Sequence, residues 1–346
     1  MEIRLKPIGE QVLVITGASS GIGLVTAKRA AERGARVVLA ARNERDLASA
    51  VHDIRDAGGR AVYQVADVAD PDQVDAIALT ALREFGRIDT WVNNAGVALY
   101  GRAMDVSLAD MRRQFDVLYW GEVHGMRTAV PHLRKQGGAL INVASALADR
   151  AVPLQGNYSA AKHALKAFTD TLRMELEADG VPISVTLVKP ASIDTPLFDK
   201  AKTYLDVEPR PIPPVYTPDV VAKAIIEAAQ RPIRDVIPGG AAAVLPLAGL
   251  LTPALTDDYM EPTMFGQQTT REPLGDRPDN LYAPVAHDGG ARGQNWAGHV
   301  RRSSLYTAVV LHPKRAALVA TGLGLAAITS VRARRRRGRS TEPAMH

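Results

Sequence analysis

Short runs of aliphatic and β-branched residues alternate with longer helical stretches between residue 11 and about residue 237. The apolar runs predict strands at residues 12–16, 36–40, 62–65, 90–93, 139–143, 183–188 and 235–237. The stretches between them predict helices at residues 21–33, 44–57, 71–85, 108–133, 156–178 and 218–230. Because the strands are apolar throughout, helices should cover both faces of the sheet. The alternation therefore predicts an α/β fold built on a doubly wound parallel sheet.

The pattern changes after residue 240. Residues 241–255 are apolar, residues 256–304 are rich in glycine, proline and charge, and residues 316–331 are apolar again. No apolar period of 2 or 3.6 continues through residues 256–304, which is typical of a loop or disordered linker. We therefore expect a single catalytic domain at residues 1–240 and a C-terminal extension. The extension divides into a partly apolar and then Gly/Pro-rich linker at 241–304 and an apolar segment with an arginine-rich tail at 305–346.

Composition excludes several classes of protein. With 46% hydrophobic and 23% charged residues, the chain has the composition of a globular protein. The absence of cysteine excludes disulfides and thiolate metal sites, and the first apolar run is too short for a signal peptide. Six arginines between residues 332 and 339 outweigh the whole net charge of +5, so no folded basic face is expected. We expect a cytoplasmic catalytic domain with no nucleic-acid partner and no metal.

A glycine-rich loop lies where the first predicted strand turns into the first predicted helix. Glycine lets the backbone approach phosphates closely, and the free N–H groups and dipole of the helix favour their negative charge. The position predicts a dinucleotide pyrophosphate site in a Rossmann fold, although such a turn taken alone is structural about as often. The expected cofactor-binding residues of this loop are Gly17, Ser19, Ser20, Gly21, Ile22 and Gly23.

The end of the second predicted strand indicates which dinucleotide binds. An acidic residue there would bind the adenosine ribose of NAD, but Ala41 and Arg42 occupy these positions. A guanidinium pairs naturally with a 2′-phosphate, so we predict NADP as the cofactor, with NADPH preferred over NADH. The alternative is that Arg42 is a solvated loop residue. Asp67, after the third strand, is expected near the adenine, with an exposed turn residue as the alternative.

Tyr158 and Lys162 are four residues apart within one predicted helix, so their side chains share a face. A free phenol titrates near pH ~10, and an adjacent ammonium stabilises the phenolate, which makes proton exchange easier at neutral pH. Ser145 follows the fifth predicted strand directly, at the end of the sheet where α/β proteins bind ligands. Its hydroxyl is suited to orient a substrate oxygen, although a turn or helix cap is the alternative role.

Taken in order, these motifs resemble the short-chain dehydrogenase/reductase family over residues 11 to about 237. They are the glycine loop, Asn93-Asn94-Ala95-Gly96, Ser145, and Tyr158 with Lys162. The resemblance implies hydride transfer between NADP(H) and a carbonyl or secondary alcohol. It gives catalytic roles to Ser145, Tyr158 and Lys162: Tyr158 is the general acid/base, Lys162 tunes it and holds the nicotinamide ribose, and Ser145 positions the carbonyl. It adds Asn94, Ala95, Gly96, Pro190 and Thr195 to the cofactor site, together with Tyr158 and Lys162. Relatives commonly form homo-oligomers through the long helices, here 108–133 and 156–178.

Two positions depart from the family pattern. Ala191 replaces a usual glycine, and Leu118 stands where the family has a catalytic asparagine. That asparagine supports a water that connects the lysine to solvent, and leucine cannot do so. Another group or water path substitutes, the enzyme is slow, or the site is catalytically silent. The alternative function is therefore a cofactor-binding module that acts as a sensor or scaffold.

The segments expected around the substrate are mostly apolar. They are residues 98–102, 147–154 and 196–214, and they contribute Leu147, Val152, Leu154, Leu197, Phe198 and Tyr204. We predict a lipophilic ketone, aldehyde or secondary alcohol, and the alternative is that these residues only pack under the lid.

Residues 316–331 form an uncharged apolar segment in front of the arginines. It is at or below the short end of the ~17 to 25 residues of a spanning helix and contains Gly322 and Gly324. We predict that residues 316–339 associate peripherally or as a re-entrant segment with an anionic membrane surface. The alternatives are a helix that packs on the catalytic domain or on a sister subunit, and a basic tail with no specific role.

Overall fold

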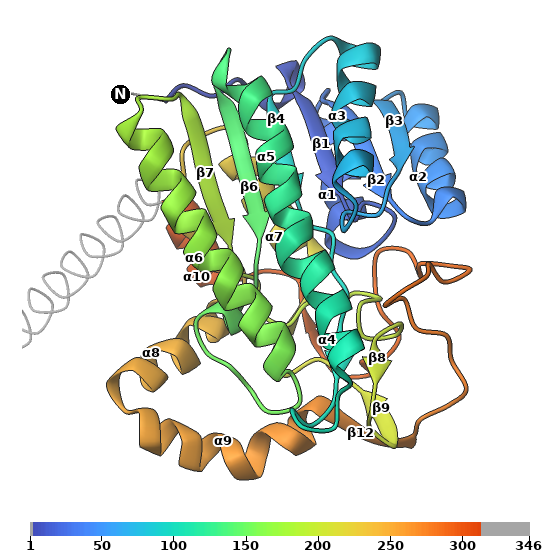
Figure 1. The fold of residues 1–346 in the computed structure, drawn as a ribbon, viewed down its shortest axis with the longest axis vertical. Helices are drawn as coiled ribbons and strands as arrows, with labels where there is room; N and C mark the ends of the chain where they lie inside the picture. Colours follow the sequence, from blue (N-terminus) through green and yellow to red (C-terminus); the bar gives the residue numbers. More distant parts are fainter. Residues whose placement is uncertain (1–2, 313–346) are drawn as a thin grey trace, which may run out of the picture.

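A computed structural model describes residues 3–312, in which a seven-stranded parallel sheet forms the centre (Figure 1). The strands run in the order β11-β7-β6-β4-β1-β2-β3. Their bounds are β1 (Val12–Thr16), β2 (Arg36–Ala41), β3 (Arg60–Val65), β4 (Thr90–Asn93), β6 (Gly138–Val143), β7 (Ile183–Val188) and β11 (Asp235–Val236). Neighbouring strands pair in parallel, for example Leu13 with Val37 on one side and with Thr90 on the other. The prediction of a doubly wound Rossmann sheet is confirmed.

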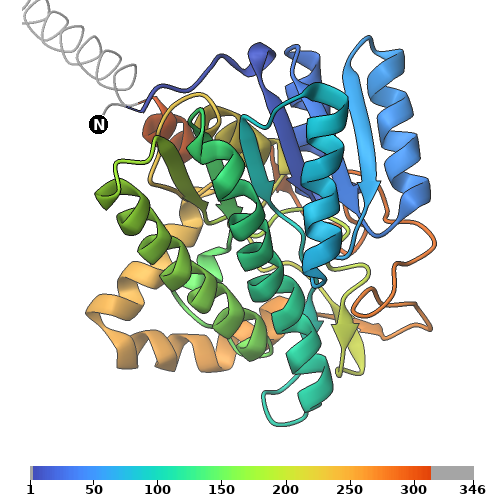
Figure 2. The ribbon, with the colours of Figure 1, turned by 45° about the horizontal axis from the view of Figure 1, so that its top comes forward.

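Helices cover both faces of this sheet, as its apolar strands require. One face carries α1 (Gly21–Glu32), α2 (Glu44–Asp56) and α7 (Pro218–Ala228), and the other carries α3 (Pro71–Phe85), α4 (Leu108–Phe115), α5 (Gly121–Arg134) and α6 (Gly156–Ala178). Figure 2 shows α3, α5 and α6 side by side in front of the sheet. Each face has its own buried core, and the two cores hold the strand ends in place.

The predicted helix at 108–133 is divided by a turn of π-helix at Asp116–Trp120. A π turn inserts one residue into the α-helical spacing and is found mostly at functional sites. The apolar periodicity is helical both before and after the turn, so the sequence pattern does not indicate the π-helical segment. The turn contacts α6, which brings the altered segment next to the helix of Tyr158 and Lys162.

The strands β1 and β4 are neighbours, so the chain leaves the sheet in opposite directions on either side of a crevice at their carboxyl ends. Three short strand pairs form beyond this edge. They are β5 (Leu99–Tyr100) with β8 (Lys202–Thr203), β9 (Val207–Pro209) with β12 (Thr269–Pro273), and β10 (Val215–Tyr216) with β13 (Val300–Arg301). Short 3-10 turns lie at η1 (Ile8–Glu10), η3 (Ala146–Ala148) and η4 (Gly240–Ala243). The crevice is therefore enclosed by segments from both halves of the chain.

The C-terminal extension packs against this same edge. It contains α8 (Val244–Leu251), α9 (Pro253–Gln268) and α10 (Leu305–Leu311), and Figure 1 shows α8 and α9 beneath the strand ends. The prediction of a linker through residues 256–304 is wrong for α9, because Met260, Met264 and Gln268 are buried at helical spacing. Among residues 3–312, no helix is both long and apolar enough to cross a membrane. The predicted membrane segment at 316–339 lies outside the described residues.

Candidate active site

A cavity of about 300 Å³ lies at the carboxyl ends of the strands. It brings together almost every residue that the sequence singled out. The residues that line it include Gly17, Ser19, Ser20, Gly21, Ile22, Arg42, Asp67, Asn94, Ala95, Gly96, Ser145, Tyr158, Lys162, Pro190 and Thr195. Gly23 is not among the lining residues, since it packs in the wall behind the loop.

The glycine loop approaches neighbouring backbone so closely that it has no room for a Cβ at two of its positions. Gly17 has a φ of +64°, and a Cβ at this position would lie 2.7 Å from the Cα of Ala95. A Cβ on Gly23 would lie 2.3 Å from the carbonyl oxygen of Gly17. The Asn94 amide donates to the carbonyl oxygens of Thr16 at 2.9 Å and Gly17 at 3.2 Å, which ties β1 to β4. These close approaches leave backbone exposed to the cavity, as binding of a dinucleotide pyrophosphate requires.

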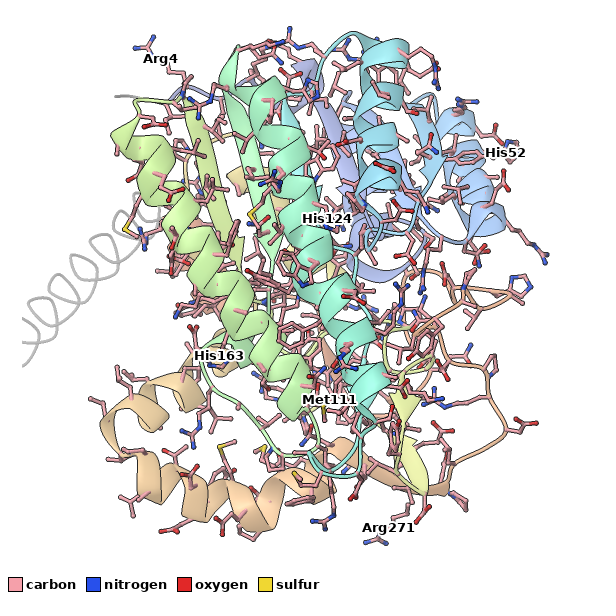
Figure 3. The ribbon with its side chains drawn as sticks, viewed as in Figure 1. Arg4, His52, Met111, His124, His163 and Arg271 are labelled. Atoms are coloured by element: carbon pink, nitrogen blue, oxygen red, sulfur yellow. The ribbon has the colours of Figure 1, made fainter. Side chains whose placement is uncertain are left out.

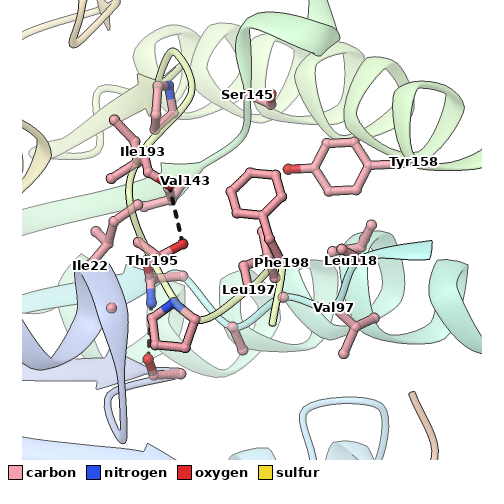
Figure 4. Close-up of a pocket in the computed structure, with 18 of the residues that line it drawn as sticks. Ile22, Val97, Leu118, Val143, Ser145, Tyr158, Ile193, Thr195, Leu197 and Phe198 are labelled. Carbon is pink, nitrogen blue, oxygen red and sulfur yellow. Dashed lines mark hydrogen bonds between the residues drawn. The ribbon is translucent and has the colours of Figure 1, made fainter. Parts of the chain in front are cut away.

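Tyr158 and Lys162 both extend from α6 towards this cavity. Figure 4 shows the Tyr158 hydroxyl pointing into the cavity, with Ser145 on one side and Leu118 on the other. The Ser145 hydroxyl accepts a hydrogen bond from the Leu147 N–H at 3.1 Å, so this serine also caps η3. Both of the roles considered for Ser145, cap and cavity residue, are therefore compatible with its position.

Glu122 is a buried acidic residue that sequence reasoning missed. The Lys162 ammonium donates to a Glu122 carboxylate oxygen at 2.8 Å and to the Val143 carbonyl at 2.9 Å. Burial raises the pKa of Glu122 to about 7, although the adjacent Lys162 charge acts in the opposite direction. Leu118 is itself fully buried, and its side chain lies against Gly96. The available signal was spacing, since Glu122 follows Leu118 by four residues in a helical stretch.

Arg42 lies at the end of the crevice where an adenosine ribose would bind. Its guanidinium donates to the carbonyl oxygens of Asn280, Leu281 and Tyr282 and lies 4.0 Å from the Asp67 carboxylate. Asp67 is paired with Arg113 as well. Burial lowers the pKa of Arg42 from its ordinary value. Arg42 is thus a partly buried cation held by several acceptors, and it is not the solvated loop residue of the alternative interpretation.

The segment at residues 280–290 covers the glycine loop, which the sequence did not indicate. The Asp288 carboxylate accepts hydrogen bonds from the Ser19 hydroxyl and from the Lys200 ammonium, the latter at 2.7 Å. The Gly21 N–H at the start of α1 donates to the Gly290 carbonyl at 2.9 Å. Because the segment reads as a polar linker, only its tertiary contacts reveal its place at the site.

The other half of the cavity is mainly apolar. Leu147, Val152, Leu154, Leu197 and Phe198 line it as expected, together with Tyr100, Ile212 and Leu245. Tyr204 is an exception, because its hydroxyl donates to Asp110 of α4 at 2.7 Å and it does not line the cavity. Burial raises the pKa of Tyr100 far above its ordinary value, so this phenol stays protonated beside Tyr158.

Metal-ligating side chains do not gather in the described part of the chain. Within residues 3–312, no group of three or more His, Cys, Asp or Glu residues is arranged to hold a metal ion. Figure 3 shows His52, His124 and His163 on separate helices.

Residues 11–205 match the family described as short chain dehydrogenase. The chain belongs to the short-chain dehydrogenase family. An uncharacterized oxidoreductase, YxnA of Bacillus subtilis (strain 168), is 45% identical over 325 residues, which cover 93% of this chain and 91% of that protein. An 11-beta-hydroxysteroid dehydrogenase A of Sesamum indicum is 34% identical and covers 65% of this chain and 67% of its own. The alignment with YxnA includes much of the C-terminal extension as well as the family region.

Solved structures agree with this assignment. A short-chain dehydrogenase/reductase from Burkholderia phymatum in complex with NAD superposes with a TM-score of 0.67 at 28% identity, covering 72% of this chain and 96% of that one. An archaeal alcohol dehydrogenase from Thermococcus sibiricus gives a TM-score of 0.58 at 24% identity, which supports the fold alone. The chain is accordingly an oxidoreductase that acts on alcohol or carbonyl groups with a nicotinamide cofactor.

Proposed function

We propose that this protein transfers a hydride between NADP(H) and a lipophilic carbonyl compound or secondary alcohol, with Tyr158 as the general acid/base. The observation that carries the proposal is that the Tyr158 hydroxyl and the glycine loop open onto the same cavity. A phenol in that position reaches a substrate oxygen whose carbon lies near the bound nicotinamide. Membership of an oxidoreductase family makes this the expected chemistry.

Each catalytic side chain has a separate task. When bound, the nicotinamide ring supplies or accepts the hydride. Tyr158 donates a proton to the substrate oxygen in reduction and takes it back in oxidation. The Lys162 ammonium stabilises the phenolate that Tyr158 forms, and the Ser145 hydroxyl donates to the substrate oxygen and orients it. The tight loop around Gly17, with residues 94–96 beside it, would hold the dinucleotide.

A preference for NADP is supported by Arg42. Its guanidinium is charged, and it lies at the ribose end of the crevice where NAD-selective relatives of this fold carry an acid. A 2′-phosphate would supply a stronger acceptor than the peptide carbonyls at residues 280–282 that Arg42 contacts here.

A lipophilic substrate is supported by the apolar half of the cavity. Leucine, isoleucine and phenylalanine side chains line the cavity that contains Tyr158, and the α8 residue Leu245 is one of them. Burial of apolar substrate surface stabilises the complex by roughly 25 cal/mol per Å². Arg150, also on the cavity wall, is paired with Asp257 and does not act as a free anion site.

The decisive experiment is turnover by the purified protein with NADPH or NADH and a panel of aldehydes, ketones and secondary alcohols. We expect turnover of apolar substrates with NADPH, and a loss of at least about 100-fold in kcat for Tyr158→Phe with little change in NADPH binding. Tyr259→Phe is a matched control, since Tyr259 is exposed on α9 and does not line the cavity. Turnover confined to small charged substrates would contradict the proposed substrate class.

A catalytically silent cofactor-binding module is the second candidate, and the buried Leu118 favours it. A silent module would bind NADPH tightly and turn over none of the panel. Retention of Ser145, Tyr158 and Lys162 around one cavity favours the enzyme, because cofactor binding alone has no use for all three. The same panel with wild type and Tyr158→Phe separates the two functions.

Two further proposals concern assembly and location. Homo-oligomers are expected through α4, α5 and α6, as in relatives of the family. Association of residues 316–339 with an anionic membrane surface is tested by sedimentation with anionic vesicles, using the full chain and a chain that ends at residue 312. Equal recovery of both proteins in the supernatant would contradict membrane association.

A further inference from the structure

The environment of Lys162 raises a question that the proposed chemistry leaves open. The Lys162 side chain is 4% exposed, and its ammonium has two protein acceptors, Glu122 and the Val143 carbonyl. In the family pattern the support for this lysine comes through the asparagine whose position Leu118 holds. A buried ammonium needs both a counter-charge and a fixed direction to remain aligned with the phenol of Tyr158. The structure supplies the counter-charge from another residue.

Glu122 lies where it can replace that support. It is four residues after Leu118, and the intervening chain passes through the π turn at Asp116–Trp120 into α5. Leu118 lines the cavity together with Tyr158 and Lys162, and Glu122 contacts Lys162, so both positions lie next to side chains of α6. Leu118 fills the space against Gly96, while Glu122 extends to the Lys162 ammonium at 2.8 Å.

Within residues 3–312, only one of the two Glu122 carboxylate oxygens is hydrogen-bonded. Glu122 is 2% exposed, and its second oxygen has no hydrogen-bond partner within the part of the chain that the structure describes. A buried carboxylate with an unpartnered oxygen costs free energy and is retained in a stable fold only where another need offsets that cost. Glu122 does not line the cavity, so it contacts neither substrate nor cofactor directly.

We propose that Glu122 is a positioning residue for catalysis, whose carboxylate holds and orients the Lys162 ammonium in place of the missing asparagine. This inference rests on the proposed function, because it assigns Glu122 a role in the proton chemistry of Tyr158. The ionised carboxylate fixes the long lysine side chain through a charge-assisted hydrogen bond. The Val143 carbonyl provides the second acceptor, so the ammonium direction is set by two points.

Because few charged groups among the described residues surround Glu122, its protonation can be followed in the pH dependence of activity. From α6, Lys162 donates to its carboxylate. From β4, the neutral amide of Asn93 donates to the Glu122 main-chain carbonyl at 3.3 Å and to the Asn142 side-chain oxygen of β6 at 2.9 Å. His124, two residues along α5, faces the Val68 carbonyl instead. Lys162 is the charged side chain that shifts the pKa of Glu122, against the larger effect of burial, and the result is about 7. Below that pH the carboxyl gains a proton and loses its charge.

The test compares wild type with Glu122→Gln, which keeps the shape and one acceptor but removes the charge. We expect kcat for carbonyl reduction to fall by about 10- to 100-fold, with KM changed less than about threefold, because ammonium alignment matters in the transition state. In wild type, kcat should decline as the pH falls below about 7, and this limb should be absent in Glu122→Gln. Glu175→Gln, on the exposed side of α6, is the matched control and should behave as wild type.

A rescue variant separates positioning from a packing role. Leu118→Asn in the Glu122→Gln background restores the amide of the family pattern, and we expect it to recover at least about tenfold of the lost kcat. If Glu122→Gln does not fold, as judged by thermal unfolding and NADPH binding, Glu122→Asp replaces it and should retain the acid limb with a reduced kcat. Unchanged kcat and an unchanged pH profile in the folded variant would overturn the inference. For Glu122→Gln, a reduced kcat that keeps the wild-type acid limb and is not rescued by Leu118→Asn would overturn it too.

These outcomes are distinct from failure of the proposed function. If wild type, Tyr158→Phe and Glu122→Gln are all inactive while NADPH binds, the proposed function fails, and the inference about Glu122 fails with it. If wild type is active, Tyr158→Phe is inactive and Glu122→Gln equals wild type, only the role of Glu122 is refuted.

Discussion

Arg42 has more acceptors around it than a surface arginine usually finds. Three consecutive peptide carbonyls at residues 280–282 and the Asp67 carboxylate share its donors. Arginine presents its donors in a planar fork, so it is oriented by such a set even without a ligand. The C-terminal extension thus orients the residue that we propose selects the cofactor, although the two are more than two hundred residues apart in sequence.

Replacement of Arg42 tests this selection. For Arg42→Ala, we expect kcat/KM with NADPH to fall by about 10- to 100-fold, because a hydrogen bond to a charged group contributes about 1.5–3 kcal/mol. The value with NADH should change less than about threefold. Steady-state kinetics with both cofactors give the measurement, and Arg45→Ala, exposed on α2, is the control. Equal losses with NADPH and NADH would show that Arg42 supports the fold and does not select the cofactor.

Glu122 predicts a pH dependence of stability that is independent of catalysis. Its pKa is raised from an ordinary value of 4.5 to about 7 in the folded chain. Between these values the folded state binds a proton that the unfolded state has lost, so this group stabilises the fold below about pH 4.5 and its contribution is lost as the pH rises through about 7. Thermal unfolding of wild type and Glu122→Gln from pH 4.5 to 8 should therefore show the variant gaining stability relative to wild type as the pH rises. A constant difference in Tm would contradict the raised pKa.

Site residues could be predicted from the sequence where their motif is local, and could not where their role depends on a distant element. Tyr158 and Lys162 are linked by helix spacing, and the glycine loop is adjacent to its strand, so sequence alone brings them together. The spacing of Glu122 from Leu118 does not by itself indicate a contact with Lys162, and Asp288 has no such neighbour in sequence. Each acquires its role through contact with an element distant in the chain. Tyr204 illustrates the opposite case: its place in an apolar segment predicts a cavity residue, but its hydroxyl donates to Asp110 and it does not line the cavity.

At the scale of elements, the crossing of α5 over the sheet depends on a glycine. A Cβ at Gly125 would lie 2.0 Å from the Asn93 side-chain oxygen and 2.9 Å from the Trp91 ring nitrogen. These two side chains are hydrogen-bonded to each other at 2.7 Å and buried beneath the helix. The helix therefore approaches β4 closely at Gly125.

Gly125→Ala should move α5 away from the sheet or break this network. We expect the free energy of unfolding to fall by about 1–3 kcal/mol, despite the better helix propensity of alanine, because the core is overpacked. Denaturant unfolding followed by circular dichroism provides the measurement. Gly156→Ala at the start of α6 is the control, since its Cβ would meet only the Ala103 side chain at 3.8 Å. Wild-type stability in Gly125→Ala would show that α5 can shift without cost.

Element prediction succeeded where burial is regular and failed where it is local. The seven strands and the six long helical stretches were predicted with ends close to those observed, because their apolar faces repeat at the period of a helix or fill both sides of a sheet. The π turn was not predicted, because one inserted residue does not visibly change the apolar pattern. Helix α9 was not predicted either, because it buries few side chains at helical spacing and contains Pro262. Short pairs such as β5 with β8 depend on distant partners alone.

At the scale of the whole molecule, the C-terminal extension packs against the crevice that the N-terminal half of the chain forms. Residues 280–290 cover the glycine loop, and β13 pairs with β10 beside it. The family match ends at residue 205, whereas the alignment with YxnA covers 93% of this chain. The extension is therefore a shared part of these two proteins, and it contributes Leu245 and Asn280 to the cavity wall.

The outer face of α4, α5 and α6 leads to a prediction about assembly. Trp120 is 48% exposed at the end of the π turn, and Met174 is 57% exposed on α6. Large exposed side chains of this kind are enriched at the centres of interfaces, where a tryptophan contributes about 2 kcal/mol or more. Since relatives commonly associate through these helices, Trp120→Glu should raise the dissociation constant of the oligomer by at least about 30-fold. Sedimentation velocity over a concentration series measures this shift. Leu251→Glu, at a 70% exposed site on α8, should leave the distribution of species unchanged, and an identical shift in both variants would place the interface elsewhere.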